Sequence, residues 1–378
     1  MRASKNKLPL SGIVVVDLSR ILAGPIAAQL LGDLGAEVIK VEAPDGDPTR
    51  GWGPPFKRGV AAYYLSCNRN KRSLIADFKT DAGCKKVRAL IRRADLVIEN
   101  FLPGDLEKFG LDYAAGKKLN PKIGWVSITG FGPAGPLKNE PGYDFLMQAM
   151  TGWMSVTGEE TGAPHKVGMA LCDVLCGMYA ASAALALLQQ INKTGRGGRL
   201  EVPLYAAAIS GLINVAQNHL LIGAPAKRWG NGHASIVPYQ SFQAKDAPLA
   251  IAVGSDAQFA KLAAILGRPG WATDARYATN SGRVKNRKGL ISAMGKILKS
   301  RPAREWIAAC RRNKIPAGPV ATVAEALNSA QSRALGLVQE LPHPELGRVK
   351  LLAPPIFLDG KPLPIRRVPP GLNKKGRG

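Results

Sequence analysis

The stretch IVVVDLSRILAGPIAAQLLGDLGAEVIKVE, at residues 13–42, decides the fold of this chain. It opens with a short apolar run, Ile13–Leu18, which is typical of a strand buried on both faces of a parallel sheet. The tripeptide AGP at 23–25 then precedes an amphipathic stretch, 26–34, and proline in the first turn favours a helix start. A glycine ends this helix, and EVIKVE at 37–42 indicates a second strand. These residues therefore predict a compact βαβ unit.

The alternation of strands and helices continues along the chain. We expect strands at 74–77, 96–99, 123–128 and 199–203, and helices at 81–94, 104–109, 143–153 and 168–190. Strands that alternate with helices imply a mostly parallel sheet with helices on both faces. The predicted fold class is therefore α/β, with a large Rossmann-like domain.

A second domain is expected after residue 222, because 378 residues are too many for one small core. Residues 223–240 are rich in Gly, Pro and Asn and indicate a linker. Residues 241–320 have a strand and three helices of their own, at 249–253, 256–266, 283–299 and 302–313, which is typical of a smaller α+β domain. Residues 321–378, with a strand at 348–352, are expected to return to the large domain that residues 1–222 begin.

Composition narrows the class of protein. The net charge is +25, but Lys and Arg are spread along the whole chain without a nucleic-acid-binding motif, so we expect no nucleic-acid partner. The five cysteines lack zinc spacing, which indicates reduced thiols in a cytoplasm and no metal site. The N-terminus has no long apolar segment, so we expect no signal peptide.

The apolar run from Gly168 to Leu188 contains one charged side chain, Asp173. The run is long enough to cross a bilayer, but its acid and its many small residues favour a buried core helix, and we expect no membrane partner. A carboxylate there costs free energy unless it is paired, hydrogen-bonded or protonated. The small neighbours Ala170, Cys176 and Gly177 are expected to leave room around it. Asp173 is therefore either a structural acid satisfied by backbone amides or a covalent nucleophile.

Two polar motifs flank predicted strands. The tetrapeptide NKRS at 70–73 precedes one strand, and ENFLPG at 99–104 follows another. Open parallel sheets bind ligands beyond their strand ends, where such residues could hold phosphates. A solvated turn is the alternative interpretation of NKRS. NAD is a weak hypothesis, because the G-x-G-x-x-G motif needs three glycines and the first turn has Gly24 alone.

Taken together, these segments resemble the class III CoA-transferases (the CaiB/BaiF family), which include formyl-CoA transferase, carnitine CoA-transferase and alpha-methylacyl-CoA racemase. The resembling stretches run in the family's order and include residues 10–50, NRNKRSLIADFKTDAG (68–83), DLVIENFLPGDLEKFGLDY (95–113), SITGFGPAGP (127–136), residues 141–158, KVGMALCDVLCGMYA (166–180), RWGNGHASIVPYQSF (228–242), RVKNR (283–287) and IPAGPV (315–320). They cover nearly the whole chain.

The resemblance implies a fold, an assembly and a reaction. The N- and C-terminal parts would share one large α/β domain, and two protomers would form an interlocked homodimer. The enzyme would move CoA from an acyl-CoA to a free carboxylic acid, without a cofactor beyond CoA itself. The family's nucleophilic aspartate falls on Asp173, which would form a covalent aspartyl intermediate.

The resemblance also implies contacts. The residues placed near CoA are Arg20, Ile21, Asn70, Lys71, Arg72, Asn100 and Lys108, and those placed in the substrate pocket are Tyr143 and Asp144. Ala43 stands where some members place an arginine against the adenine, so the adenine would need another partner, such as Arg50 or a nearby lysine.

The choice between transferase and racemase depends on one position. The racemases pair their aspartate with a histidine in a Gly-His-Asp motif, and this chain has tyrosine at 143. The ordinary pKa of tyrosine is near 10, which makes it a poor base at neutral pH. The four histidines lie outside the motif. A transferase is therefore favoured, while a racemase or CoA-ester isomerase and a non-catalytic basic binding protein stay open as alternatives. No glycine-rich loop like that of formyl-CoA transferase is found, which favours a dicarboxylic, aromatic or carnitine-like acid over oxalate or formate.

Overall fold

The computed structural model describes residues 8–372 in two compact units. The first contains the chain up to Trp153, Lys166–Ala224 and the residues from Ser329 onward. The second contains Met154–His165 and Pro225–Asn328. The sequence predicts an uninterrupted first domain to residue 222 and a return to it from residue 321. The structure instead places 154–165 in the second unit and begins the return at Ser329.

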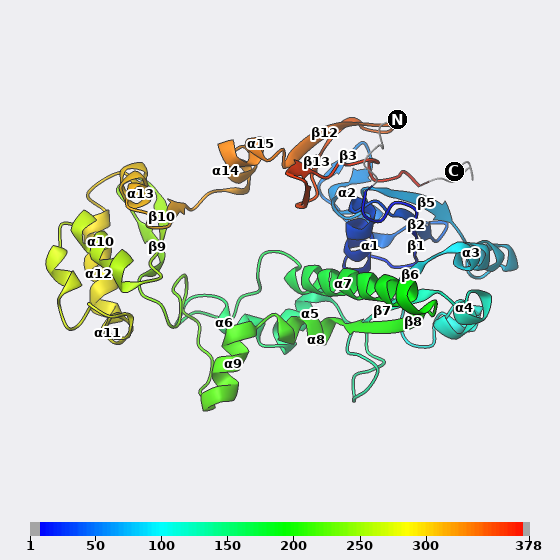
Figure 1. The fold of residues 1–378 in the computed structure, drawn as a ribbon, viewed down its shortest axis with the longest axis horizontal. Helices are drawn as coiled ribbons and strands as arrows, with labels where there is room; N and C mark the ends of the chain where they lie inside the picture. The colour runs from blue at the N-terminus through cyan, green and yellow to red at the C-terminus, as the bar shows by residue number, and fades with distance from the viewer. Residues whose placement is uncertain (1–7, 373–378) are drawn as a thin grey trace. The chain divides into compact units, whose positions relative to one another are not determined.

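A six-stranded parallel sheet forms the centre of the first unit (Figure 1). Its spatial order is β5-β2-β1-β6-β7-β8, with bounds Lys71–Ile75, Glu37–Glu42, Val14–Asp17, Leu96–Glu99, Gly124–Thr129 and Gly198–Pro203. Every neighbouring pair is parallel. This confirms the predicted α/β class with a large parallel sheet.

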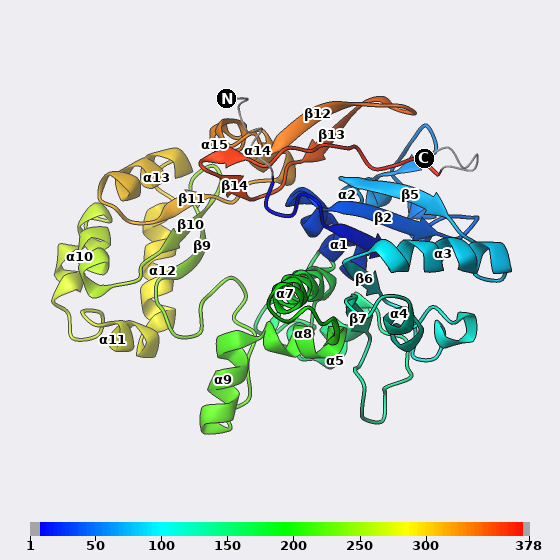
Figure 2. The same ribbon diagram turned by 45° about the vertical axis from the view of Figure 1, so that its right-hand side comes forward.

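Alternating side chains of the strands feed two separate cores. Val15 of β1 packs with α1 (Ala23–Asp33), α7 (Leu171–Thr194) and α8 (Leu204–Ser210). The next residue, Val16, packs with α3 (Asp81–Arg93) on the opposite face. Neighbouring residues of a strand point to opposite faces, so a strand that is apolar throughout needs helices on both sides. Figure 2 shows α7 and α3 on the two sides of the sheet.

Helices α1 and α7 pack together at a glycine. A Cβ on Gly177 would lie 2.7 Å from the carbonyl oxygen of Ala23 and 3.0 Å from the side chain of Ile26. The space beside Gly177 is therefore filled by α1, and our expectation that it clears room around Asp173 was wrong. Residues 171–194 form the one helix among residues 8–372 that is long and apolar enough to cross a membrane, and one of its faces is buried in the core.

The C-terminal part of the chain packs on the first unit beside β5. Strands β12 (Val338–His343) and β13 (Gly347–Leu352) form an antiparallel pair. Val349, Leu351 and Ile365 form a small core with side chains from α2 (Ala62–Ser66) and β4 (Val60–Ala61). The remaining short elements of this part are α15 (Ala330–Ala334), β14 (Phe357–Leu358) and β15 (Lys361–Pro362). Helix α14 (Val323–Leu327) comes before them and belongs to the second unit.

The second unit has its own core. A three-stranded antiparallel sheet, β11-β10-β9, is made by Ala317–Pro319, Pro248–Ala252 and Tyr239–Gln243. It is covered by α10 (Asp256–Ile265), α11 (Asn280–Lys285), α12 (Arg287–Leu298) and α13 (Ala303–Arg312), whose buried faces include Phe259, Met294 and Trp306.

Some predicted elements differ from those observed. The strand predicted at 74–77 begins three residues earlier, at Lys71, because it pairs with β2 from its first residue. The helix predicted at 104–109 is only a short 3-10 turn, Glu107–Phe109. The observed elements without a predicted counterpart include α4 (Tyr113–Leu119), α8, α9 (Ile213–Ile222), β9, β11 and β12. The helix predicted at 143–153 is split into α5 (Asp144–Met150) and α6 (Trp153–Val156).

Candidate active site

A cavity of about 300 Å³ lies beyond the carboxyl ends of the central strands in the first unit. The loops after β1, β6 and β7 and the start of α7 meet there, as expected for an open parallel sheet. Its lining includes Arg20, Ile21, Trp52, Asn100, Phe101, Lys138, Glu140, Tyr143 and Asp173. Four predicted functional residues besides Asp173 are thus brought together with it: Arg20, Ile21, Asn100 and Tyr143.

The loop after β1 is fixed by hydrogen bonds from two other segments. The side chain of Asn100 accepts from the N–H of Arg20 at 2.8 Å and donates to the carbonyl of Arg20 at 2.8 Å. Ile21 has φ 71°, and its N–H donates to Asp47 Oδ2 at 3.2 Å. Above the loop, the Arg20 guanidinium lies 4.6 Å from the centre of the Phe101 ring. Arg20 and Asn100 are therefore held in one arrangement at the mouth of the cavity.

Buried ion pairs support this loop from below. Lys40 Nζ lies 2.8 Å from Asp47 Oδ2 and donates to the carbonyl of Ser19 at 2.9 Å. Lys71 Nζ lies 2.9 Å from Asp17 Oδ2, and all four side chains are almost completely buried. The lysine charges lower the pKa of Asp17 and of Asp47 against the effect of burial. These pairs fix the shape of the turn between β1 and α1.

Asp173 lies in the first turn of α7 beside a second carboxylate. The residue before the helix, Ala170, offers no side-chain cap. Instead Asp144 Oδ1, from α5, accepts the N–H groups of Cys172 at 2.8 Å and Asp173 at 3.3 Å. Asp144 thus satisfies free amides at the start of the helix, as a capping residue does. It is not among the residues that line the cavity.

The carboxylate of Asp173 is half-buried and faces the cavity. Within residues 8–372 it accepts no hydrogen bond and pairs with no cation. Burial, and then the negative charge of Asp144, raises its pKa to about 7. A carboxylate that is desolvated and unpaired retains the reactivity that hydrogen bonds would reduce, which is the state required of a nucleophile.

Gln148 fixes the segment that leads into α7. Its Nε2 donates to Asp144 Oδ2 at 2.6 Å and to the carbonyl of Met169 at 3.2 Å, while its Oε1 accepts the N–H of Val167 at 2.8 Å. The side chain is fully buried. Asp144 and Gln148 therefore connect α5 to the start of α7 and hold Asp173 in place.

Three residues near Asp173 were missed by the sequence analysis. Trp52 and Lys138 line the cavity. Tyr63 packs edge-on against Trp52, with ring centres 5.3 Å apart, and its pKa is raised to about 12 by burial and then by the charge of Asp173. The Tyr63 hydroxyl therefore stays protonated and able to donate. No pattern in the sequence singles it out from the adjacent Tyr64, whose hydroxyl instead accepts from Arg50 at 2.6 Å.

Four residues predicted to contact CoA lie outside the cavity. Asn70 is buried and bonds Asp33 and the C-terminal segment, and Lys71 is buried in the ion pair with Asp17. Arg72 pairs with Glu37 at 3.5 Å at the N-terminal end of β5. Lys108 is exposed and pairs with Asp105 at 2.7 Å. For residues 70–72 the reason is topological, because they lie at the N-terminal end of β5, at the edge of the sheet opposite the cavity.

Arg50 is also engaged elsewhere. Its guanidinium makes a two-pronged pair with Glu42, at 2.8 Å for each bond, and stacks 3.7 Å from the Tyr64 ring centre. It also donates to the carbonyl of Pro370 at 3.0 Å. Ala43 is exposed at the end of β2. Arg50 is therefore a structural residue here and not a free partner for an adenine.

Comparison with known proteins agrees with this architecture. The model of CoA-transferase family III matches residues 10–376. A succinate–glutarate CoA-transferase of Agrobacterium fabrum is 42% identical over 376 residues, covering 98% of this chain and 94% of the relative. A human succinyl-CoA:glutarate CoA-transferase is 39% identical, covering 98% and 84%.

Solved structures show the same relationship. A CaiB/BaiF family protein from Brucella suis has a TM-score of 0.86 and 42% identity, covering 98% of both chains. A protein from Mycobacterium tuberculosis has a TM-score of 0.86 at 28% identity, covering 97% of both chains. The chain belongs to CoA-transferase family III. The names of the relatives support CoA transfer over the racemase alternative.

Proposed function

We propose that this protein transfers CoA from an acyl-CoA to a free carboxylic acid, with Asp173 as the covalent nucleophile. The observation that carries the proposal is the unpaired carboxylate at the start of α7, facing a cavity at the carboxyl edge of the sheet. The names of the relatives support CoA transfer as the reaction, and the position of Asp173 supports its role as the nucleophile.

The proposed chemistry needs neither redox change nor net proton transfer. A carboxylate oxygen of Asp173 attacks the thioester carbonyl, the C–S bond breaks, and CoA leaves as a thiolate, so that a mixed anhydride between the acyl group and Asp173 remains. The thiolate then attacks the Asp173 carbonyl, releasing the donor acid and leaving an aspartyl-CoA thioester. The acceptor carboxylate then attacks the aspartyl-CoA thioester, which releases the CoA thiolate and forms a second mixed anhydride. The thiolate attacks the acceptor carbonyl of this anhydride, which gives the new acyl-CoA and frees the Asp173 carboxylate. Covalent catalysis divides one difficult exchange into easier steps.

The surrounding side chains suit this sequence. Tyr63, with its raised pKa, can donate a hydrogen bond to an oxygen that gains charge near Asp173. Arg20, Ile21 and Asn100 form the turn that we propose contacts CoA. Tyr143, 56% exposed at the start of α5, would contact the acid. We do not retain direct CoA contacts for Asn70, Lys71, Arg72 and Lys108, or a substrate contact for Asp144.

We propose a dicarboxylic acid as acceptor. The relatives named for succinate and glutarate support this class. Lys138 lines the cavity with Asp173 and has no ion-pair partner among residues 8–372, so it can receive a distal carboxylate. No further cofactor is proposed.

We further propose that the first unit is the CoA-binding domain and the second the small domain of an interlocked homodimer in the cytoplasm. The exposed apolar side chains of α9 support a second copy as partner. Ile213, Leu220, Leu221 and Ile222 are each more than 70% exposed. An apolar surface of this kind marks an interaction site.

The test is CoA exchange by the full-length protein. With succinyl-CoA and glutarate, the wild type is expected to form glutaryl-CoA, and Asp173→Ala to lose at least about 10³-fold in rate. Glu160→Ala, an exposed acid of the second unit, is the matched control and should keep the wild-type rate. Hydroxylamine added during turnover should label the peptide containing Asp173 as a hydroxamate.

Two outcomes would contradict the proposal. Deuterium incorporation at the α-carbon of a 2-methylacyl-CoA without exchange would indicate an isomerase. Full exchange activity in Asp173→Ala, with unchanged thermal unfolding, would remove Asp173 from the mechanism.

A further inference from the structure

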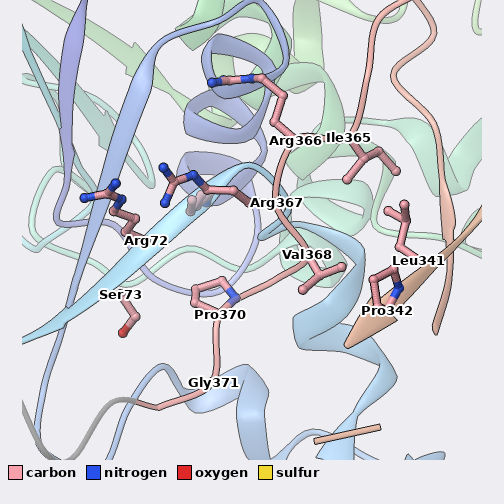
Figure 3. Close-up of a pocket in the computed structure, with 11 residues that line it drawn as sticks. Arg72, Ser73, Leu341, Pro342, Ile365, Arg366, Arg367, Val368, Pro370 and Gly371 are labelled. Carbon is pink, nitrogen blue, oxygen red and sulfur yellow. The ribbon is translucent and has the colours of Figure 1, made fainter. Parts of the chain in front are cut away.

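A second cavity in the first unit lies at the other edge of the sheet from Asp173. Its volume is about 770 Å³, within the range of small-molecule sites. Its walls are the start of β5, strand β12 and the segment 365–371 (Figure 3). Since the six strands are parallel, the N-terminal end of β5 and the catalytic cavity are at opposite edges. The mechanism proposed above does not use this cavity.

Two guanidinium groups converge at its wall. Figure 3 shows Arg72 and Arg367 directed toward the same space and Arg366 turned away. Arg366 donates to the carbonyls of Gly32 and Ala36 and is therefore engaged in the structure. Arg72 has one half-exposed carboxylate, Glu37, at 3.5 Å. Among residues 8–372 no carboxylate pairs with Arg367.

Asn70 fixes Arg367 opposite Arg72. Its side-chain oxygen accepts the backbone N–H of Arg366 at 2.7 Å and of Arg367 at 3.0 Å, and its own N–H donates to the carbonyl of Arg367 at 2.9 Å. Asn70 has φ 61°, a left-handed conformation that asparagine adopts more readily than most residues. The basic turn at 70–72 thus joins the C-terminal segment to β5 and orients both arginines.

The charges at this site are not balanced. Arg72, Arg366 and Arg367 line the cavity together with no acidic residue. The charge of Arg367 adds to burial in lowering the pKa of Arg366. An anion between Arg72 and Arg367 would offset the positive charge of these two side chains. The opposite wall is apolar, made by Leu341, Pro342, Val368 and Pro370.

We infer that this cavity binds a small organic dianion, whose charged head group lies between Arg72 and Arg367 and whose body packs on the apolar wall. Guanidinium groups recognise phosphate and carboxylate oxygens in pairs, which suits a phosphomonoester or a dicarboxylate. The shared chemistry is two negative charges beside an apolar or ring portion. Nucleoside phosphates and dicarboxylic acids are the two sources of such a head group.

The experiment measures binding to the full-length protein by calorimetry, with ADP in one arm and glutarate in the other. The catalytic cavity can also take such ligands, so the double variant Arg72→Gln/Arg367→Gln identifies the second site. We expect one ligand site per chain to be lost, or its affinity to fall at least about tenfold. Arg92→Gln/Arg93→Gln removes the same charge from the exposed end of α3 and should bind like the wild type.

Hydrogen exchange locates the ligand. Backbone amides of 365–371 and of β5 should exchange more slowly when the ligand is present, in the wild type but not in the double variant. The arm that gives this protection identifies the source of the head group. Equal binding by wild type and double variant, equal loss in the Arg92/Arg93 control, or no protection of 365–371 in either arm would each overturn the inference.

Discussion

Two neighbouring acids, Asp144 of α5 and Asp173 in the first turn of α7, differ in what surrounds them. Asp144 accepts two backbone N–H groups and the amide of Gln148, whereas Asp173 accepts no hydrogen bond within residues 8–372. Hydrogen bonds favour the charged form of a carboxylate, and desolvation disfavours it. One carboxylate is therefore satisfied by the structure, and its neighbour is left available for chemistry.

The pKa of Asp173 gives a prediction for the pH dependence of catalysis. Because the nucleophile must be ionised and its pKa is about 7, kcat/KM for the acyl-CoA should rise with pH through about 7. Asp144→Asn keeps an oxygen that can accept the α7 amides but removes the charge that helps to raise this pKa. Its midpoint should therefore move to lower pH. Initial rates from about pH 5 to about pH 9 measure both profiles.

The free energy of unfolding should fall with pH over the range in which kcat/KM rises. The pKa of Asp173 is raised in the folded state above its ordinary value of 3.8, so its contribution to stability is complete below that value and is lost as pH rises through about 7. Asp173→Asn should remove this part of the pH dependence of unfolding.

In the kinetic experiment, a pH midpoint of Asp144→Asn that equals or exceeds the wild-type midpoint would contradict the charge of Asp144 as a cause of the raised pKa of Asp173.

Lys40 provides a second test at this scale. Lys40→Met leaves Asp47 buried without its cation, which should cost about 3–5 kcal/mol in free energy of unfolding. The turn at 19–21 should also loosen, raising KM for the acyl-CoA. Urea unfolding measures the first effect and initial rates the second. Lys117→Met, on the exposed face of α4, should change neither, and equal behaviour of the two variants would contradict the supporting role of Lys40.

At the scale of elements, the contact between α1 and α7 determines where Asp173 lies. Gly177 lets the two helix backbones approach closely, and Gly24 leaves room for the Ser19 side chain, which a Cβ at position 24 would overlap. Helix α1 follows the turn that carries Arg20, and α7 carries Asp173. Their packing therefore sets the distance between the proposed CoA-binding turn and the nucleophile.

Gly177→Ala should disturb this contact. The added methyl group would meet the Ala23 carbonyl at 2.7 Å, and overpacking of this kind costs about 1–3 kcal/mol. The transfer rate should fall as well. Gly295→Ala, in α12 with open space around it, should instead leave stability unchanged or raise it by about 0.5–1 kcal/mol. Urea unfolding compares them, and equal stability of both variants would argue against a tight α1–α7 contact.

At the scale of the whole molecule, the exposed apolar residues of α9 are the surface on which the proposed homodimer can be tested. Leu220 and Leu221 are 75% and 76% exposed. Leu220→Asp/Leu221→Asp should therefore weaken the proposed homodimer or prevent its formation. Light scattering after gel filtration should give the mass of two chains for the wild type and of one for the variant.

A charge control distinguishes this effect from general repulsion. Lys117→Asp/Lys118→Asp introduces two acids on α4 and should leave the dimer intact. A wild-type protein with the mass of one chain would contradict the proposed homodimer. An α9 variant that stays dimeric at every dilution would contradict the role of α9 in it.

The sequence by itself determined the sheet and the family, and it singled out Asp173 as the candidate nucleophile. Short runs of mostly apolar residues such as 13–18 are typical of strands buried on both faces of a parallel sheet, and their alternation with helices predicted the fold class. Asp173 stood out because a charge in an apolar helix is costly wherever that helix packs. The matched motifs include Arg20, Ile21, Asn100 and Tyr143, which all line the cavity, because each follows a strand or begins a helix at the carboxyl edge.

Only the tertiary structure decided which polar residues are free. Asn70, Lys71 and Arg50 have the composition of phosphate contacts, but partners distant in sequence engage each of them: Arg367, Asp17 and Pro370. The same applies to Tyr63 and Asp144, whose roles depend on their proximity to Asp173. Hydrogen bonding and desolvation act between atoms that the fold brings together, and the order of residues along a chain does not contain those distances.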